Sequence, residues 1–452
     1  MKNKHLIWVF VFISVCAIFC PLYFCFPDTA HVGELSDNQV VNPYEAINYE
    51  KMKDYLEKLE LEFPELVEKK VIGKSVDGRN IILVKVGKGD HLFNVIGSMH
   101  ARERITTNII LKNIEDYGNA YRNNKKIDGY DVRELLDQVT IYFVPNANPD
   151  GVEYTISGEE SILTEEAREA YQEVKTNPHS KWWNQDLRWK ANIRGVDLNY
   201  NWDFGWHQED SCFDIGVPAD AFFKGHYPHS EPEVKAIKRL TVSHPFLMHF
   251  SYHTQGRLIL WYKYQTGEDL EDAIEVTRKI QEHTGFIPVP AVGSIPEDYR
   301  SYRGYADWTV AEFNKIGKTI EFAQKQYCEK DFDEIYKPGK ALPLLLAEEV
   351  LRLESKYDHY VYVEGQLVQR FKSLDESREF ISKYIKGQVK ESINLKVVRE
   401  DELLIPGEKS EYEEQEGERL TTFKEYLREL GEKIQKWYGS LGLKKFQGLL
   451  FI

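Results

Sequence analysis

The sequence contains few cysteines outside its first 26 residues. Only Cys212 and Cys328 follow that segment, in a chain of 452 residues with five cysteines in all. Two isolated cysteines could form one disulfide in an oxidising compartment, but they exclude a disulfide framework. They also exclude a zinc site built from cysteines, because such sites need cysteines at close and repeated spacings. A metal site in this chain would have to use other side chains.

Positive charge is also scarce. The chain has 58 Lys and Arg residues against 73 Asp and Glu residues, which gives a formal net charge of -15. This balance argues against a general nucleic-acid-binding protein, because such proteins need clustered bases to neutralise phosphates. The chain is not disordered, since 42 % of its residues are hydrophobic and 13 % are aromatic. We expect one large core and a smaller second unit.

The longest apolar run lies at the amino terminus. Residues 6–26 carry no charge and follow the short basic segment "MKNKH". Such a run is roughly long enough to cross a bilayer, and the lysines before it would hold that end in the cytoplasm. We expect residues 1–30 to be an export signal or a membrane anchor, and the poor match of "PDTA" to a cleavage site favours the anchor. In both cases the rest of the chain would be exported, to the outer face of the membrane or the cell wall.

Between residues 40 and 356, short apolar runs alternate with segments of helical periodicity. Strands are expected at residues 80–87, 92–100, 139–151, 246–254, 257–263 and 318–323, and helices at 49–62, 106–122, 268–284 and 343–355. This alternation predicts an α/β domain with a mixed, mostly parallel sheet that is flanked by helices on both faces.

The pattern changes after residue 356. A hairpin-like segment, a helical segment and one more strand predict a small α/β appendage over residues 357–400. Residues 401–452 form an acidic linker followed by an amphipathic helix, whose start has the capping-box pair Thr422 and Glu425. We expect this helix to pack on the protein itself, and its apolar tail leaves membrane contact open.

Three side chains that suit zinc follow predicted strands. His100 and Glu103 lie in "GSMHARERIT" directly after one strand, and His253 lies at the end of another in "HFSYHTQG". The carboxyl ends of strands in an open α/β sheet meet at one edge, where ligands bind. Two imidazoles and a carboxylate are a ligand set of catalytic zinc sites. His249 shares a face of its strand with His253, and we expect it to pack or to support the site without binding metal.

These residues lie in motifs that resemble the zinc carboxypeptidase family. His100, Glu103 and His253 match the three zinc ligands of that family, and Arg102 in "HARE" matches its substrate-contacting arginine. The motifs "PNANPDG", "GVDLN", "GHYPHSEPE", "GYADW" and "KTIEFA" follow in the order of the family. The resemblance covers roughly residues 44 to 355, and it implies the family fold and one Zn²⁺ per chain.

The resemblance also implies the catalytic groups. Glu321 in "TIEFA" matches the glutamate that takes a proton from the attacking water and delivers it to the leaving amine. A charged side chain inside an apolar strand is otherwise costly. The arginine that stabilises the oxyanion in the family follows a tryptophan, and here Lys190 follows Trp189, with Arg188 on the other side. We assign the oxyanion role to Lys190.

Two further assignments come from the resemblance. Asp197 matches the carboxylate that accepts the second N–H of the first zinc histidine and so orients its ring. Tyr299 matches the mobile tyrosine that closes over bound substrate, with Tyr302 as its rival.

The chain departs from the family where a carboxypeptidase binds the free C-terminal carboxylate. The family uses an Asn–Arg pair, and this chain has Asn199 followed by Tyr200. Tyrosine offers one neutral hydrogen bond and no charge, so this carboxylate anchor should be weak. The runs "WKANIRGVDLNYNW" and "YHTQGRLILWY" resemble a subgroup, the bacterial γ-D-glutamyl-meso-diaminopimelate peptidases. Ala306, at the position of the family's pocket-floor residue, leaves room without predicting a particular side chain.

We therefore expect a monomeric, exported zinc peptidase that acts on the stem peptides of bacterial peptidoglycan, at the bond between γ-D-Glu and the diamino acid. Asn199, Tyr200, Arg102 and Tyr299 would contact the substrate. An exported carboxypeptidase with another carboxylate anchor, such as Arg257 or Arg303, is the nearer alternative. A non-catalytic cell-wall-binding protein of the same fold is the more distant one.

Overall fold

The structure is a computed structural model, and it describes most of the chain between residues 39 and 356. The described residues are 39–178, 188–204, 206, 215–261, 265, 267–290, 304–324 and 329–356, together with the backbone of three strands between residues 359 and 399. All of them belong to the second of the two units into which the chain divides, residues 39–452. The expected anchor, Cys212, Cys328, Tyr299, Tyr302, Arg303 and the C-terminal helix lie outside the described residues.

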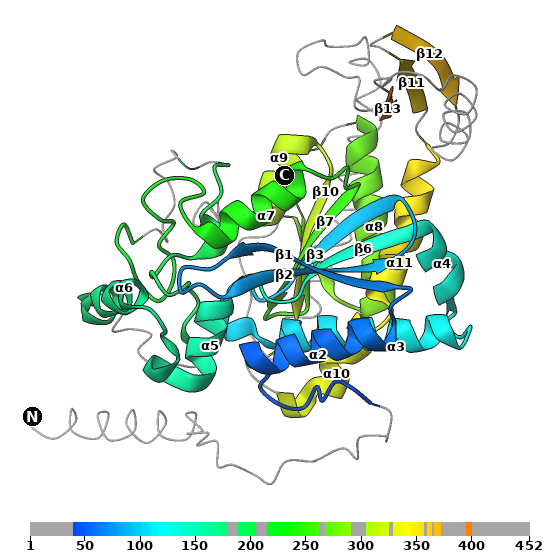
Figure 1. The fold of residues 1–452 in the computed structure, drawn as a ribbon. Coiled ribbons are helices and arrows are strands. Elements are labelled where there is room, and N and C mark those ends of the chain that lie inside the picture. Colours follow the sequence, from blue (N-terminus) through cyan, green and yellow to red (C-terminus); the bar gives the residue numbers. More distant parts are fainter. Residues whose placement is uncertain are drawn as a thin grey trace, which may run out of the picture. The chain divides into compact units, whose positions relative to one another are not determined.

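An eight-stranded sheet forms the centre of the fold, in the order β1-β2-β6-β3-β7-β10-β8-β9 (Figure 1). The strands are β1 Val67–Lys74, β2 Asn80–Gly87, β3 His91–Ile96, β6 Val139–Val144, β7 Met248–Thr254, β8 Leu258–Trp261, β9 Ile287–Pro290 and β10 Ile316–Phe322. The central strands β6, β3, β7 and β10 pair in parallel, whereas β1 pairs antiparallel with β2 and β8 antiparallel with β10. The predicted mixed, mostly parallel sheet is confirmed.

Helices cover both faces of this sheet (Figure 1). The helices are α2 Tyr49–Glu62, α3 Ile105–Arg122, α4 Val132–Gln138, α5 Pro149–Ser157, α6 Glu165–Thr176, α7 Pro232–Val242, α8 Gly267–Thr284, α9 Tyr305–Phe313, α10 Phe332–Gly339 and α11 Leu342–Glu354. One apolar cluster joins one face of the sheet to α2, α3, α4, α8 and α11, and a second joins the other face to α7 and α9. In β2 the side chains of Ile81 and Leu83 point into the second cluster and those of Ile82 and Val84 into the first, as strand alternation requires.

The predicted helices over residues 49–62, 106–122, 268–284 and 343–355 correspond closely to α2, α3, α8 and α11. The sequence did not predict β1, β9, α4, α5, α6, α7, α9 or α10, and the strand expected over 139–151 ends at Val144, with α5 beginning at Pro149. Strand β1 lies at the edge of the sheet, has the lysine-rich sequence "VEKKVIGK" and buries only Val67, so it lacks the apolar run of a central strand. Among the described residues, no helix is long and apolar enough to span a bilayer.

Two smaller sheets complete the described structure. Strands β4 Lys126–Ile127 and β5 Tyr130–Asp131 form a short hairpin before α4. Strands β11 His359–Val363, β12 Gln366–Phe371 and β13 Leu395–Arg399 form an antiparallel sheet in the order β12-β11-β13. The hairpin and the additional strand expected in the appendage are therefore present. The boundaries of that appendage as a domain stay a prediction.

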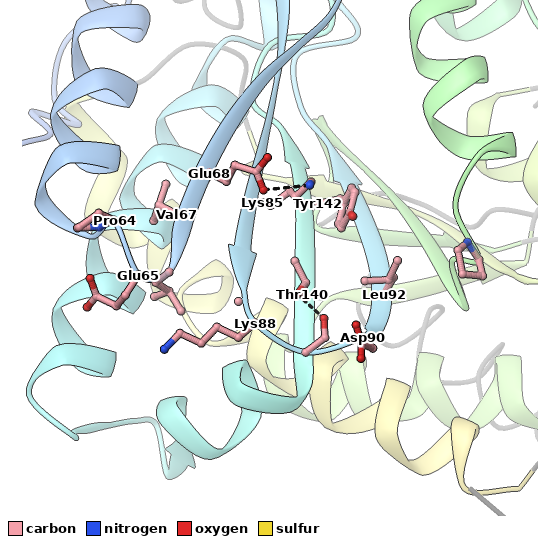
Figure 2. Close-up of a pocket in the computed structure, with 14 residues that line it drawn as sticks. Pro64, Glu65, Val67, Glu68, Lys85, Lys88, Asp90, Leu92, Thr140 and Tyr142 are labelled. Atoms are coloured by element: carbon pink, nitrogen blue, oxygen red, sulfur yellow. Dashed lines mark hydrogen bonds and ion pairs between the residues drawn. The ribbon is translucent and has the colours of Figure 1, made fainter. Parts of the chain in front are cut away.

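A surface pocket of about 520 Å³ lies where β3 and β6 begin (Figure 2). Its lining includes Asp90, Leu92, Thr140 and Tyr142, together with Lys85, which pairs with Glu68 at 3.0 Å. None of the predicted site residues lines it. The chemistry-bearing residues instead gather at the opposite end of these strands, where the chain leaves the sheet.

Candidate active site

The three predicted metal ligands come from two neighbouring strands. His100 and Glu103 follow β3, and Glu103 closes the short 3-10 helix Ala101–Glu103. His253 lies near the end of β7, which pairs in parallel with β3. Gly97 allows β3 to end this close to its neighbours, because a Cβ there would lie 2.7 Å from the carbonyl oxygen of Pro145. The sheet thus brings together residues that are some 150 positions apart.

The ligand atoms of these residues converge on one point. His100 Nδ1 lies 2.9 Å from Glu103 Oε1, His253 Nδ1 lies 2.9 Å from Glu103 Oε2, and the two Nδ1 atoms are 3.0 Å apart. All three side chains are buried. Two imidazole nitrogens that face each other and a carboxylate can share one cation between them, and this donor set is that of catalytic zinc. The residues present therefore fit a Zn²⁺ ion.

Asp197 lies against the His100 ring of this group. Its Oδ1 atom lies 3.2 Å from His100 Nε2, on the side of the ring away from the converging Nδ1 atoms. Burial alone would raise the pKa of Asp197, but Lys190 and His100 outweigh it and hold the pKa well below its usual range. A permanently charged Asp197 fixes the orientation of the His100 ring.

Glu321 lies on β10 directly opposite His253 in the parallel register of β7 and β10. Its Oε2 atom is withdrawn from solvent and has no hydrogen-bond partner in the described part of the chain. Burial and then the charge of Glu103 raise the pKa of Glu321 well above its usual value, and Lys190 and Arg102 oppose this shift. An unpartnered carboxyl beside the converging ligands has the position of a group that exchanges protons.

Lys190, the predicted oxyanion donor, is buried. Its Nζ atom lies 2.7 Å from Asp197 Oδ2 and faces the rings of Tyr200 and Phe222, with centroids at 5.0 and 4.7 Å. Sequence reasoning identified Lys190 and Tyr200 but missed Phe222, which lies in a segment without a recognisable motif. Arg188 is exposed.

Asn199 and Arg102 are two of the residues to which the sequence assigns substrate contacts. Asn199 Oδ1 accepts a hydrogen bond of 3.0 Å from the backbone N–H of Tyr305, and Gly304 permits this approach because a Cβ there would lie 2.7 Å from the same oxygen. No described residue accepts a hydrogen bond from Asn199 Nδ2.

Arg102 Nε lies 3.9 Å from Glu103 Oε1, and its side chain is 14 % exposed. Sequence reasoning missed buried Asp220, whose pKa burial raises to about 7 against the charge of Arg102.

Two other predicted residues lie outside the converging group. His249 is buried against Asn94 and Tyr305, with its Nδ1 atom 3.3 Å from Asn94 Oδ1 and from the Tyr305 hydroxyl. Burial lowers the pKa of His249 to about 3, so the ring is neutral and packs as expected. Arg257, the alternative carboxylate anchor, donates to the exposed carboxylate of Glu334 on α10.

Comparison with known proteins identifies the family. The model of a family described as zinc carboxypeptidase matches residues 52–340. The chain belongs to the zinc carboxypeptidase family. Its similarity to a curated relative, gamma-D-glutamyl-L-diamino acid endopeptidase 1 of Lysinibacillus sphaericus, is 31 % identity over 317 residues, which covers 68 % of this chain and 74 % of the relative. This chain is therefore a zinc metallopeptidase, and its predicted fold, cofactor and reaction class are confirmed.

Other relatives are covered less completely. The chain is 34 % identical to uncharacterized protein YqgT of Bacillus subtilis over 56 % of its own length and 64 % of that protein. It is 28 % identical to carboxypeptidase E of Caenorhabditis elegans over 46 % of its length and 40 % of that protein. Bovine thrombin-activatable fibrinolysis inhibitor, solved with a tick carboxypeptidase inhibitor, has a TM-score of 0.53 at 21 % identity and covers 69 % of this chain and 99 % of that one. This last likeness supports the fold.

Proposed function

We propose that this metallopeptidase hydrolyses the bond between γ-D-Glu and the diamino acid in stem peptides of bacterial peptidoglycan. This proposal depends mainly on the identity and surroundings of residue 200. Next to Asn199, where a carboxypeptidase needs a cation, the chain has Tyr200, whose ring lies against Lys190. The relative named as a gamma-D-glutamyl-L-diamino acid endopeptidase supports the same substrate class. Since such substrates lie outside the cytoplasm, the proposal includes export of residues 40–452.

The chemistry of the γ-linked substrate fits the charges of the site. A γ-linked D-Glu keeps its α-carboxylate free, only a few bonds from the carbonyl that is attacked. The guanidinium of Arg102, partly exposed next to Glu103, can pair with that carboxylate in two parallel hydrogen bonds. Asn199 Nδ2, which donates to no residue in the described part of the chain, can donate to the diamino acid on the other side. An α-linked peptide has no free carboxylate at this position of its acyl side.

In the proposed reaction the metal ligands, the proton-transfer group and the oxyanion donor are different side chains. His100, Glu103 and His253 would hold Zn²⁺, which when bound polarises the scissile carbonyl and acidifies a water molecule. Glu321, whose Oε2 atom has no hydrogen-bond partner among the described residues, accepts the proton of the attacking water and donates it to the leaving amine. Lys190 supplies positive charge for the oxyanion, and Asp197 keeps both Lys190 and His100 in place.

An exported carboxypeptidase that removes C-terminal amino acids is the second candidate. The similar proteins that are named as carboxypeptidases favour it. It needs a cation for the substrate carboxylate, and Arg257 is engaged with Glu334. The proposal therefore favours the γ-D-glutamyl bond.

A stem tetrapeptide separates the two candidates. We would incubate the purified full-length protein with L-Ala-γ-D-Glu-meso-diaminopimelate-D-Ala and identify the products by mass spectrometry. Cleavage at the γ bond releases L-Ala-D-Glu, whereas a carboxypeptidase releases D-Ala. The α-linked isomer of the same peptide is the matched control, and we expect it to be cleaved at least ten times more slowly because Arg102 loses its partner. Release of D-Ala alone would replace the proposal by the second candidate.

A further inference from the structure

The ammonium of Lys190 is enclosed by three groups. Its Nζ atom lies 2.7 Å from Asp197 Oδ2, 4.7 Å from the centroid of the Phe222 ring and 5.0 Å from that of the Tyr200 ring. The two rings are themselves neighbours, with centroids 6.2 Å apart. Lys190 as a whole is only 7 % exposed. A side chain that normally ends in water is here held among a carboxylate and two aromatic faces.

We propose that Tyr200 and Phe222, here called the aromatic clamp, are positioning residues that hold Lys190 in the active site. Tyr200 then acts on the reaction through Lys190, and its hydroxyl is not required to bind the substrate. The inference rests on the proposed function, in which Lys190 stabilises the oxyanion.

A lysine at this position needs such support. The ammonium is a compact charge on a flexible four-carbon chain, and a single hydrogen bond to Asp197 leaves its direction poorly fixed. An arginine could use its planar fork to bind the carboxylate at two points. Aromatic faces attract a cation through their quadrupole, so two rings restrict the lysine from two more directions. The two rings thus fix the direction of the ammonium group, which the lysine side chain cannot fix by itself.

The backbone around Asp197 assembles the clamp. The N–H of Tyr200 donates to the carbonyl of Asp197 at 2.9 Å, and the N–H of Phe222 donates to Asp197 Oδ2 at 3.3 Å. The N–H of Asp197 donates to the carbonyl of Phe223 at 2.8 Å. Phe222 adopts φ = 66°, a left-handed conformation that is unfavourable for a large side chain. Strained residues of this kind persist where the surrounding structure holds them, and they cluster at functional sites.

The clamp also accounts for the missing charge at residue 200. An arginine here would bring a second cation against the ammonium of Lys190, since the ring that it replaces lies 5.0 Å from Nζ. The neutral ring of Tyr200 avoids that repulsion and adds attraction. The loss of the carboxylate anchor and the presence of a lysine at residue 190 are therefore two consequences of one arrangement.

A double-mutant cycle tests the clamp in the full-length, zinc-loaded protein. We expect Tyr200→Leu to lower kcat roughly tenfold with KM within about twofold, and Tyr200→Phe to stay within about twofold in both, because the ring is kept. In a Lys190→Met background, Tyr200→Leu should have no further effect. Tyr227→Leu is the matched control, because it removes an exposed tyrosine that faces Lys235 in a similar contact at 5.8 Å.

A second measurement does not depend on activity. Acetylation of Lys190 by acetic anhydride, followed by peptide mass spectrometry, should be slow in the wild type and in Tyr200→Phe and several times faster in Tyr200→Leu. Equal labelling in all three would overturn the clamp, as would an undiminished effect of Tyr200→Leu on kcat in the Lys190→Met background. A large rise of KM in Tyr200→Phe would assign the hydroxyl to substrate binding instead. A wild type that cleaves no γ-D-glutamyl bond would contradict the proposed function, and the labelling would still test the clamp.

Discussion

Lys318 is buried with no counter-charge among the described residues, and replacing it with methionine should stabilise the protein. It lies on β10 and is 1 % exposed. Its Nζ atom faces the Trp261 ring at 5.5 Å, and no described carboxylate pairs with it. Burial lowers the pKa of Lys318 to about 7. Methionine has a similar length and no charge to desolvate, so it fills the same space.

The magnitude follows from the difference in proton binding between the two states. In the unfolded chain the lysine pKa is about 10.4, and each tenfold difference in proton affinity is worth about 1.4 kcal/mol. The cost of charging Lys318 in the fold is therefore roughly 4 kcal/mol at neutral pH. Between about pH 7 and pH 10 the unfolded chain binds this proton more strongly than the fold. Between these pH values the destabilisation caused by Lys318 therefore decreases as the pH rises, and below about pH 7 it is constant.

Urea denaturation at pH 7 and at pH 9.5 measures this effect. Lys318→Met should raise the free energy of unfolding by up to roughly 4 kcal/mol at pH 7, and the gain should shrink at pH 9.5. Lys74→Met, at an exposed position of β1, is the matched control and should change little. Activity should survive, because residues 318 and 321 point to opposite faces of their strand. A variant that gains no stability at pH 7, or gains equally at both pH values, would show that Lys318 is not destabilised by burial of its charge.

Three further predictions concern the catalytic group. Glu321→Gln should retain bound zinc, measured by atomic absorption, and lose roughly 10²- to 10⁴-fold in kcat, because amide cannot exchange the proton; unchanged turnover would exclude Glu321 as the base. Asp197→Asn should weaken zinc binding about 10- to 100-fold, measured by competition with a chromogenic chelator. The control Asp203→Asn alters the pair with His229 at 3.6 Å, outside the metal group, and should not weaken it. Equal effects of the two substitutions would show that Asp197 does not support the metal site. Removal of the metal with 1,10-phenanthroline should abolish hydrolysis and lower the thermal midpoint, and added Zn²⁺ should restore both; activity that persists in metal-free protein would contradict the metal site.

Much of the fold and of the metal group could be predicted from the sequence, because both depend on local patterns. The residues Ile81–Val84 of β2 are apolar and buried and all of β6 is buried, as expected for strands covered on both faces, while His100 follows β3 and His253 lies near the end of β7. Topology then places them together, since β3 and β7 are parallel neighbours. Local patterns and a motif order were sufficient for this part of the site.

The surroundings of Lys190 could not be predicted in the same way. The contact joins Lys190, Asp197, Tyr200 and Phe222 across separate loops, and no periodicity or spacing relates residue 190 to residue 222. The sequence indicated that Tyr200 lacks a charge, and only the structure indicates what its ring touches. A motif identifies a residue by its position along the chain, whereas the partner of a side chain depends on how loops pack.

Hydrolysis of the stem tetrapeptide in ¹⁸O-labelled water shows which bond the enzyme cleaves and whether Glu321 is needed. We expect one ¹⁸O atom in the γ-carboxyl group of the L-Ala-D-Glu product, located by fragmentation in the mass spectrometer, and formation of that product roughly 10²- to 10⁴-fold more slowly by the Glu321→Gln protein. Label in the C-terminal carboxyl group of L-Ala-γ-D-Glu-meso-diaminopimelate, with release of D-Ala, would contradict the proposed function.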